Sequence, residues 1–205
     1  MKKTVKIMAF VLCAVMLVVG SVFGTYAYLT SQTQVIKNTF TVGNVAITLD
    51  ETKTDEYGKA GDPVVRWSDV EGNTYKLIPG HTYTKDPKIT VSADSEDCWV
   101  FIKVENGLAD IEMTGDSSKP TIVEQMTAAG WVAVETNVYA YTVEALSEGD
   151  EVTAFTSFTI KGDKGYADVS AYGNATIKVT GYAVQADGFA IAQAAWTAAK
   201  GNFGF

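Results

Sequence analysis

The first fifty residues constrain this chain most, because they combine an export signal with the start of a β-strand. Three lysines among the first six residues precede an apolar run over residues 7–23. Thr25 and Ala27 then place small residues at the positions that a signal peptidase reads. The sequence therefore predicts a signal peptide over residues 1–27, cleaved so that Tyr28 becomes the new N-terminus.

The alternative is a membrane anchor that is never cleaved, since residues 7–23 approach the roughly 20 apolar residues that a membrane span needs. Gly20, Ser21 and Gly24 interrupt the run near its end and favour cleavage. A type IV pilin signal is a second alternative, but the start lacks the usual glycine and early glutamate. If the signal is cleaved, the membrane is a partner only through the uncleaved precursor.

Residues 28–49 predict one long strand whose apolar phase changes partway. Apolar side chains fall first on even and then on odd positions: Ile36, Phe40 and Val42, followed by Val45, Ile47 and Leu49. Because strand side chains alternate between faces, both sets share a buried side only if a β-bulge adds one residue at Gly43–Asn44. Gly43 is a suitable pivot because glycine tolerates positive φ. The outer half, residues 28–42, can then leave the domain while the inner half stays in its sheet.

Two segments of this region resemble the TasA/camelysin family of exported Gram-positive proteins. They are residues 24–28 (Gly-Thr-Tyr-Ala-Tyr) and residues 38–47 (Asn-Thr-Phe-Thr-Val-Gly-Asn-Val-Ala-Ile). Further on, residues 77–80 with 85–87, and residues 185–189, are similar to a clostridial-type branch of the same family. The close resemblance is strongest over residues 20–49.

The resemblance implies a secreted protein of the Gram-positive cell surface or extracellular matrix, with a signal removed by a SipW-type peptidase. It also implies a jelly-roll β-sandwich and a head-to-tail homopolymer, in which residues 28–42 of one subunit complete the next. The assembly residues would be Ile36, Phe40, Val42 and Gly43. On this reading the protein is a fibre subunit and not an enzyme.

Composition is consistent with one domain after the signal. Residues 28–205 carry 13 basic residues, which is the total of 16 less three signal lysines, against 24 acidic ones, so the net charge is about −11. A chain of this length can bury its own core. Nucleic acid and anionic membrane surfaces select for basic patches, so neither is an expected partner.

Cys98 is the one cysteine left after removal of the signal, so no disulfide can form within the exported chain. It begins an apolar strand, and we expect a buried, unreactive thiol. The alternative is a redox-sensitive or subunit-linking thiol, which needs an exposed, electropositive setting. The neighbouring Asp94, Glu96 and Asp97 make the local charge negative instead.

Catalytic chemistry is not expected, because the chain has one histidine, His81, predicted as an exposed turn residue. A zinc protease needs a pair such as His-Glu-x-x-His, and a cysteine or serine protease needs a histidine beside its nucleophile. The peptidase label given to camelysin-type relatives therefore has no ligand set here. A carboxylate-pair glycosidase has no evident acid and base in the sequence.

No cofactor is expected either, and calcium is the alternative. Acidic side chains gather in three loops: Asp94/Glu96/Asp97, Asp110/Glu112/Asp116 and Glu148/Asp150/Glu151. None has the Asp-x-Asp-x-Asp-Gly spacing of a preformed calcium loop. Five aromatic residues could line a sugar groove in a monomeric adhesin or carbohydrate-binding module, although core packing is expected: Trp67, Trp99, Trp131, Tyr139 and Tyr141.

For residues 50–205 the patterns predict an all-β sandwich of about eight or nine strands with two short helices. Residues 50–63 are expected as an exposed loop, and residues 98–104 as the central strand. The other expected strands are 64–67 paired with 74–77 as a hairpin, 89–91, 131–135, 138–144, 152–160 and 175–185, with a further hairpin turn at 161–165. The helices are expected at 121–129, capped by Thr121 and Glu124, and at 189–199, anchored by Phe189 and Trp196.

Overall fold

The computed structural model describes residue 3 and residues 6–17, 43–68 and 72–205. Residues 6–17 are helical and their apolar side chains are exposed, Phe10 by 83%. Among the described residues, no helix is both long and apolar enough to cross a membrane. The predicted cleavage residues Thr25, Ala27 and Tyr28, and the predicted assembly residues Ile36, Phe40 and Val42, lie outside the described residues.

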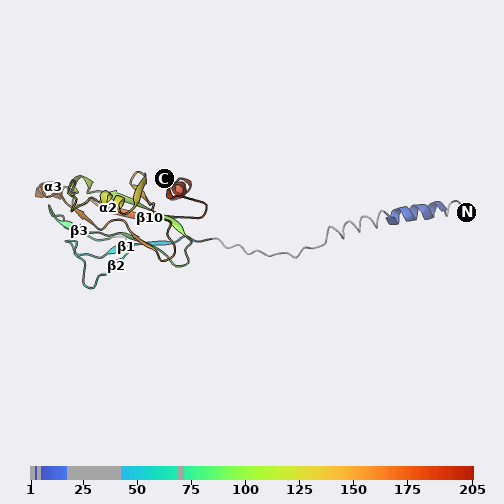
Figure 1. Cartoon of the computed structure of the whole chain (residues 1–205), viewed down its shortest axis with the longest axis horizontal. Coiled ribbons are helices and arrows are strands. Elements are labelled where there is room, and N and C mark those ends of the chain that lie inside the picture. Colours follow the sequence, from blue (N-terminus) through green and yellow to red (C-terminus); the bar gives the residue numbers. More distant parts are fainter. Residues whose placement is uncertain (1–2, 4–5, 18–42, 69–71) are drawn as a thin grey trace. The chain divides into compact units, whose positions relative to one another are not determined.

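The domain over residues 43–205 is mainly β and sandwich-like, as predicted (Figure 1). One antiparallel sheet has the order β2-β1-β4-β8: Arg66–Trp67, Ile47–Thr52, Lys88–Val91 and Glu151–Thr153. The second has the order β10-β5-β7-β6: Ile177–Gln185, Cys98–Asn106, Val138–Tyr141 and Trp131–Glu135. A two-stranded sheet joins β3 (Thr82–Thr84) to β9 (Ser157–Thr159). The described residues thus hold ten strands.

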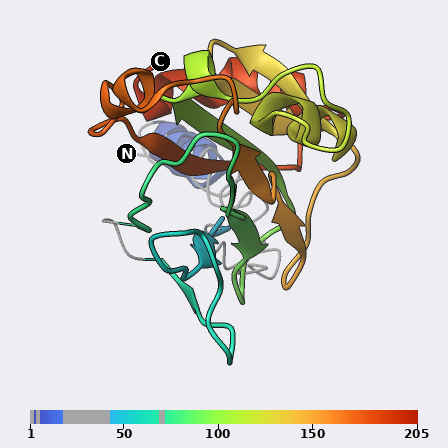
Figure 2. The same ribbon diagram turned by 90° about the vertical axis from the view of Figure 1, so that its left-hand side faces the viewer.

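Helices are few and short. They are α2 (Ile122–Ala128), α3 (Tyr166–Ser170) and α4 (Ala192–Ala199), with 3-10 turns η1 (Ala109–Ile111) and η2 (Lys200–Phe203). Figures 1 and 2 show α2, α3 and α4 on the side of the second sheet, and β1 and β2 on the opposite side. Among the described residues of the domain, no helix therefore lies on its β1 side.

Strand β5 is the centre of the second sheet, which confirms the prediction. It pairs with β10 from Cys98↔Gln185 to Asn106↔Ile177, and with β7 on its other side. Its two faces are buried for different reasons. Val100 and Ile102 belong to the core between the sheets, whereas Trp99 and Phe101 belong to a second cluster with Trp196 of α4. This arrangement explains why the strand is apolar on both faces.

The two predicted helices are also confirmed. The Thr121 hydroxyl accepts a hydrogen bond from the Glu124 N–H at 3.2 Å, and the Glu124 carboxylate accepts one from the Thr121 N–H at 2.7 Å. This capping box fixes the start of α2, and Gly130 follows its end with φ of 92°. α4 covers the second sheet through the buried Trp196, with Phe189 half-buried in the same cluster.

Several local predictions are wrong. Residues 50–52 belong to β1, not to an exposed loop, and Thr52 is buried. Arg66–Trp67 pair with Thr52 and Glu51 of β1, and residues 74–77 form no strand, so the predicted hairpin does not form. Residues 152–160 form two strands in different sheets because Ala154 and Phe155 turn into the core between them. The hairpin expected after residue 160 is replaced by α3, which Gly165 and Asp168 start.

Candidate functional site

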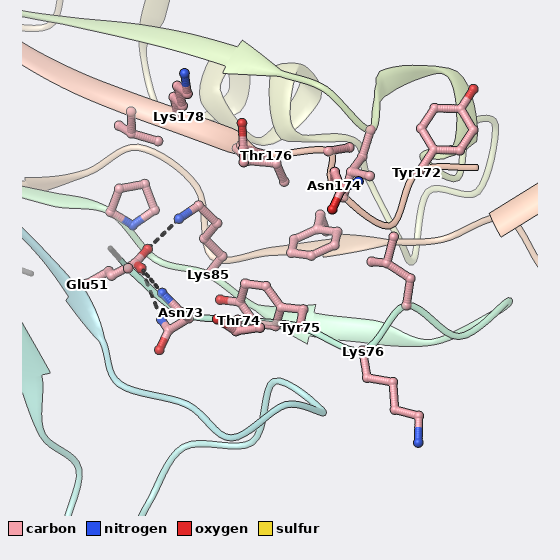
Figure 3. A pocket seen from close by; sticks show the side chains of 18 of the residues that line it. Glu51, Asn73, Thr74, Tyr75, Lys76, Lys85, Tyr172, Asn174, Thr176 and Lys178 are labelled. Carbon is pink, nitrogen blue, oxygen red and sulfur yellow. Dashed lines mark hydrogen bonds and ion pairs between the residues drawn. The ribbon is translucent and has the colours of Figure 1, made fainter. Parts of the chain in front are cut away.

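The domain has a cavity of about 1120 Å³, here called the groove. It is lined by residues 49–51 of β1, Trp67, residues 72–77, Lys85, and the segment from Tyr172 through Thr180 of β10. Figure 3 shows Asn174, Thr176 and Lys178 on one side, and Glu51 with residues 73–76 on the other. The groove therefore lies between strands of the two different sheets.

One edge of β10 borders the groove, and this edge has no strand partner among the described residues. β10 pairs with β5 along one side, and it ends its sheet in the part of the chain that the structure describes. Its residues Ile177–Thr180 line the groove. Because an unpaired strand edge presents N–H and C=O groups in a row, this edge can accept a further strand.

Seven apolar side chains of the groove are only half-buried. They pack against the main core and also line the groove: Leu49, Tyr75, Leu77, Tyr172, Ala175, Ile177 and Val179. They come from both sheets, from the segment just before β10 and from the segment that faces β10. An apolar segment placed in the groove would bury them further, at about 25 cal/mol per Å² of apolar surface.

The wall formed by residues 75–78 is held by tyrosine side chains instead of by strand pairing. The Tyr75 hydroxyl donates to the Thr84 carbonyl at 2.8 Å, and the Tyr83 hydroxyl donates to the Lys76 carbonyl. The Tyr83 oxygen also accepts from the Ile78 N–H at 2.7 Å. Burial raises the pKa of Tyr75 to about 12, so its hydroxyl stays protonated and keeps donating.

An ionic cluster next to the groove explains the unexpected pairing of β2. Arg66 Nε lies 2.6 Å from Asp50 Oδ1, and Arg66 Nη1 lies 2.6 Å from Asp86 Oδ2. The Asp86 carboxylate also accepts from the backbone N–H and the hydroxyl of Thr52, at 2.7 and 2.9 Å. The Arg66 guanidinium therefore links β2 both to β1 and to the segment just before β4.

A second polar set lines the groove itself. Lys85 Nζ lies 2.5 Å from Glu51 Oε2, and Asn73 Nδ2 donates to Glu51 Oε1 at 3.0 Å (Figure 3). Lys85 is 8% exposed. The sequence did not predict this set, because Asn73 and Lys85 lie 22 and 34 residues from Glu51.

Gly43 is the one predicted assembly residue within the described chain. The predicted bulge is not observed, since neither Gly43 nor Asn44 belongs to a strand. The Asn44 carbonyl instead accepts from the Glu96 N–H at 2.8 Å, and a Cβ on Gly43 would lie 3.1 Å from Glu96 Cγ. The inner half behaves as predicted, because Val45, Ile47 and Leu49 pack against the main core.

Cys98 is fully buried, as predicted, and burial raises the pKa of its thiol to about 11. His81 differs from the prediction. It is half-buried, with Nε2 2.9 Å from the Tyr57 carbonyl and its ring 4.6 Å from the Tyr83 ring. His81 therefore contacts the Tyr57 backbone and the Tyr83 ring, and it is not an exposed turn residue.

Carboxylates of two acidic loops accept hydrogen bonds from the backbone of their own loop. Among the described residues, no three His, Cys, Asp or Glu side chains are grouped so as to hold a metal ion. Asp116 accepts from the Ser118 N–H at 2.9 Å and Asp150 from the Ser147 N–H at 2.8 Å, and both bonds close turns. Of the five aromatic residues proposed for a sugar groove, Trp67 lines the groove, while Trp99 and Trp131 are buried.

Comparison with known proteins finds no matching family model, no matching curated protein and no matching solved structure.

Proposed function

We propose that the chain is an exported structural subunit of cell-surface or matrix fibres, in which residues 28–42 of one copy occupy the groove of the next. The observation that carries this proposal is the unpaired edge of β10 beside a groove lined by half-buried apolar side chains. An added strand supplies the missing main-chain hydrogen bonds and covers the apolar surface at the same time. The site needs no catalytic group for this function.

The segment proposed as the occupant has the chemistry that the groove requires. Ile36, Phe40 and Val42 lie on one face of an extended chain, because all three positions are even. Residues 36–42 would span roughly 20 Å as a strand, a usual strand length in proteins. Lys37 is the one charged residue between 28 and 42, so little charge would be desolvated.

Local geometry favours a second copy over the chain's own segment. Residues 44–46 continue the line of β1 along residues 92–96, through Ser92 N–H to the Ala46 carbonyl at 2.9 Å and Ala46 N–H to Ser95 Oγ at 3.2 Å. The groove instead contains residues 49–51, toward the opposite end of β1. To fill its own groove, the preceding segment would have to reverse and run back past β1.

Exchange between copies leads to a filament. Donor segment and groove are different parts of the subunit, so the contact is head-to-tail and need not close on itself. The proposal includes export through a SipW-type signal peptidase and a jelly-roll connection of the strands, both of which follow from the TasA/camelysin resemblance.

The second candidate is a monomeric adhesin or carbohydrate-binding module. Trp67, Asn73 and Asn174 in the groove favour it, since an aromatic ring and amides are common sugar contacts. A peptidase is disfavoured because the sequence has a single histidine.

Electron microscopy of the exported protein, with and without residues 28–42, tests the proposal. Fibres from the complete protein and monomers from the truncated one are expected. Monomers in both samples that bind polysaccharide would favour the adhesin.

A further inference from the structure

Three side chains in the wall of the groove form a set that is suited to covalent chemistry. One oxygen of the Glu51 carboxylate, Oε2, lies 2.5 Å from Lys85 Nζ. The other, Oε1, accepts from Asn73 Nδ2 at 3.0 Å. Figure 3 shows both side chains directed at this one carboxylate. One carboxylate, a group that can carry protons, therefore contacts both an amine and a carboxamide.

The set is largely shielded from solvent. The Lys85 and Glu51 side chains are exposed by 10% and 12%. A neutral amine is the form that can attack a carbonyl carbon.

The carboxamide of Asn73 is oriented and polarised. Its oxygen accepts a hydrogen bond from the Thr54 backbone N–H at 2.9 Å. Its nitrogen donates to the Thr52 carbonyl at 2.8 Å as well as to Glu51. The Thr54 N–H therefore points at the atom that becomes negative when Cγ is attacked, as a donor in an oxyanion hole does.

We propose that Lys85 and Asn73 become joined by an intramolecular amide bond, with Glu51 carrying the protons. Glu51 takes a proton from Lys85, and Nζ attacks Cγ of Asn73 while Oδ1 accepts the electron pair. Glu51 then protonates Nδ2, and the Cγ–Nδ2 bond breaks with release of ammonia. The second proton on Nζ passes through Glu51 to that ammonia, and the Nζ–Cγ amide remains. A lysine ammonium and a carboxamide thus give a secondary amide and an ammonium ion, and Glu51 returns to its carboxylate form. No oxidant, metal or cofactor is needed.

The amine has to move from Oε2 to Cγ, and the lysine side chain with its four rotatable bonds allows this. Amide formation between Lys85 and Glu51 itself is the competing reaction, with loss of water. It is disfavoured because the hydrogen-bond donor that would stabilise the oxyanion, Thr54 N–H, contacts Asn73.

The bond would join residues 72–77 to the segment just before β4, and so fix one wall of the groove. It would supply a covalent staple to an exported chain that has one cysteine left after signal removal. This inference does not depend on fibre formation.

Intact-mass measurement and a tryptic map of the full chain test the proposal. The expected mass is that of the processed sequence less one ammonia per chain, and the expected fragment joins residues 67–76 to residues 77–88, with no cleavage after Lys85. Separate, unmodified fragments in the wild-type protein would overturn the proposal, whatever the variants do. A Lys85–Glu51 link with loss of water would overturn it too.

Variants assign the role of Glu51. Glu51→Gln keeps the shape of the side chain but cannot carry protons, so at least a 100-fold loss of cross-linked chains is expected. Lys85→Arg should give none. The matched control is Glu135→Gln, which removes the carboxylate of another lysine pair, Lys200 Nζ to Glu135 Oε2 at 2.7 Å, and should leave cross-linking unchanged. Full cross-linking in Glu51→Gln would contradict the assigned role.

Discussion

The buried carboxylate of Glu112 accepts a hydrogen bond from the backbone N–H of Ile122, the first residue of α2, at 2.7 Å. Its other oxygen accepts from Asn106 Nδ2 at 2.9 Å, so the side chain links the end of β5 to the helix. Glu112 is 5% exposed, and burial raises the pKa of its carboxyl group despite these hydrogen bonds. Ionisation of Glu112 is therefore harder in the folded than in the unfolded protein.

The first prediction is a pH dependence that follows from this shift. When a carboxyl pKa is higher in the folded state, the folded state binds more protons than the unfolded state. The contribution of Glu112 to the free energy of unfolding therefore falls as pH rises from the ordinary pKa near 4.3 through the folded-state pKa. In urea unfolding between pH 4 and pH 7, Glu112→Gln should therefore gain stability relative to wild type as the pH rises.

Glu124→Gln is the matched control on the same helix. The hydrogen bonds from Thr121 lower the pKa of Glu124, so its carboxylate stabilises the fold at higher pH and that contribution is lost as pH falls through the folded value. Relative to wild type this variant should lose stability as the pH rises. Parallel curves for Glu112→Gln and wild type would contradict the shift assigned to Glu112.

The second prediction concerns Cys98. Its side chain is fully buried and its pKa is raised to about 11, so a thiol reagent should react only when the domain opens. The full chain contains an internal control, because Cys13 is exposed and should react quickly. Labelling of Cys98 in native protein at the rate of Cys13 would show that the strand opens locally.

The third prediction concerns processing. Mass spectrometry of exported protein should show Tyr28 as the first residue, because Thr25 and Ala27 fit a signal peptidase site. Recovery of nothing but the intact chain, in the membrane fraction, would favour the uncleaved anchor.

Elements with strong local signals were predictable from the sequence. The apolar run of β5 and the Thr121–Glu124 cap of α2 each lie within a few residues, and both elements form where expected. A strand at β2 was predicted, but its pairing with β1 was not predictable, because it depends on contacts of Arg66 with Asp50 and Asp86, which lie 16 and 20 residues away. The break between β8 and β9 likewise depends on burial of Phe155 in the assembled core.

The groove and its residues could not be identified from the sequence. It is built from segments that lie up to about 130 residues apart, from Leu49 to Thr180. Its polar set needs Glu51, Asn73 and Lys85 together, and no spacing rule connects them. Tertiary packing alone brings these residues to one wall.

Strand exchange needs an intact donor segment and an intact groove, and two variants test these two parts separately. Phe40→Asp places a charge on the donor segment, and Leu77→Asp places one in the groove. Strand exchange would bury Phe40 at each junction, so its loss should cost roughly 1.5–3 kcal/mol of binding free energy per junction, or one to two powers of ten in affinity. Each variant alone should stay monomeric.

The matched controls should still form fibres. They are Thr39→Asp, on the other face of the donor segment, and Val143→Asp, at a position that is 63% exposed.

The most direct measurement is the molar mass of an equimolar mixture of the Phe40→Asp and Leu77→Asp proteins. Leu77→Asp keeps an intact donor segment, and Phe40→Asp keeps an intact groove. The account predicts a one-to-one dimer that does not grow, because the complex offers only a damaged donor and a damaged groove. A mixture that stays monomeric while wild-type protein forms fibres, or fibres from Phe40→Asp alone, would contradict it.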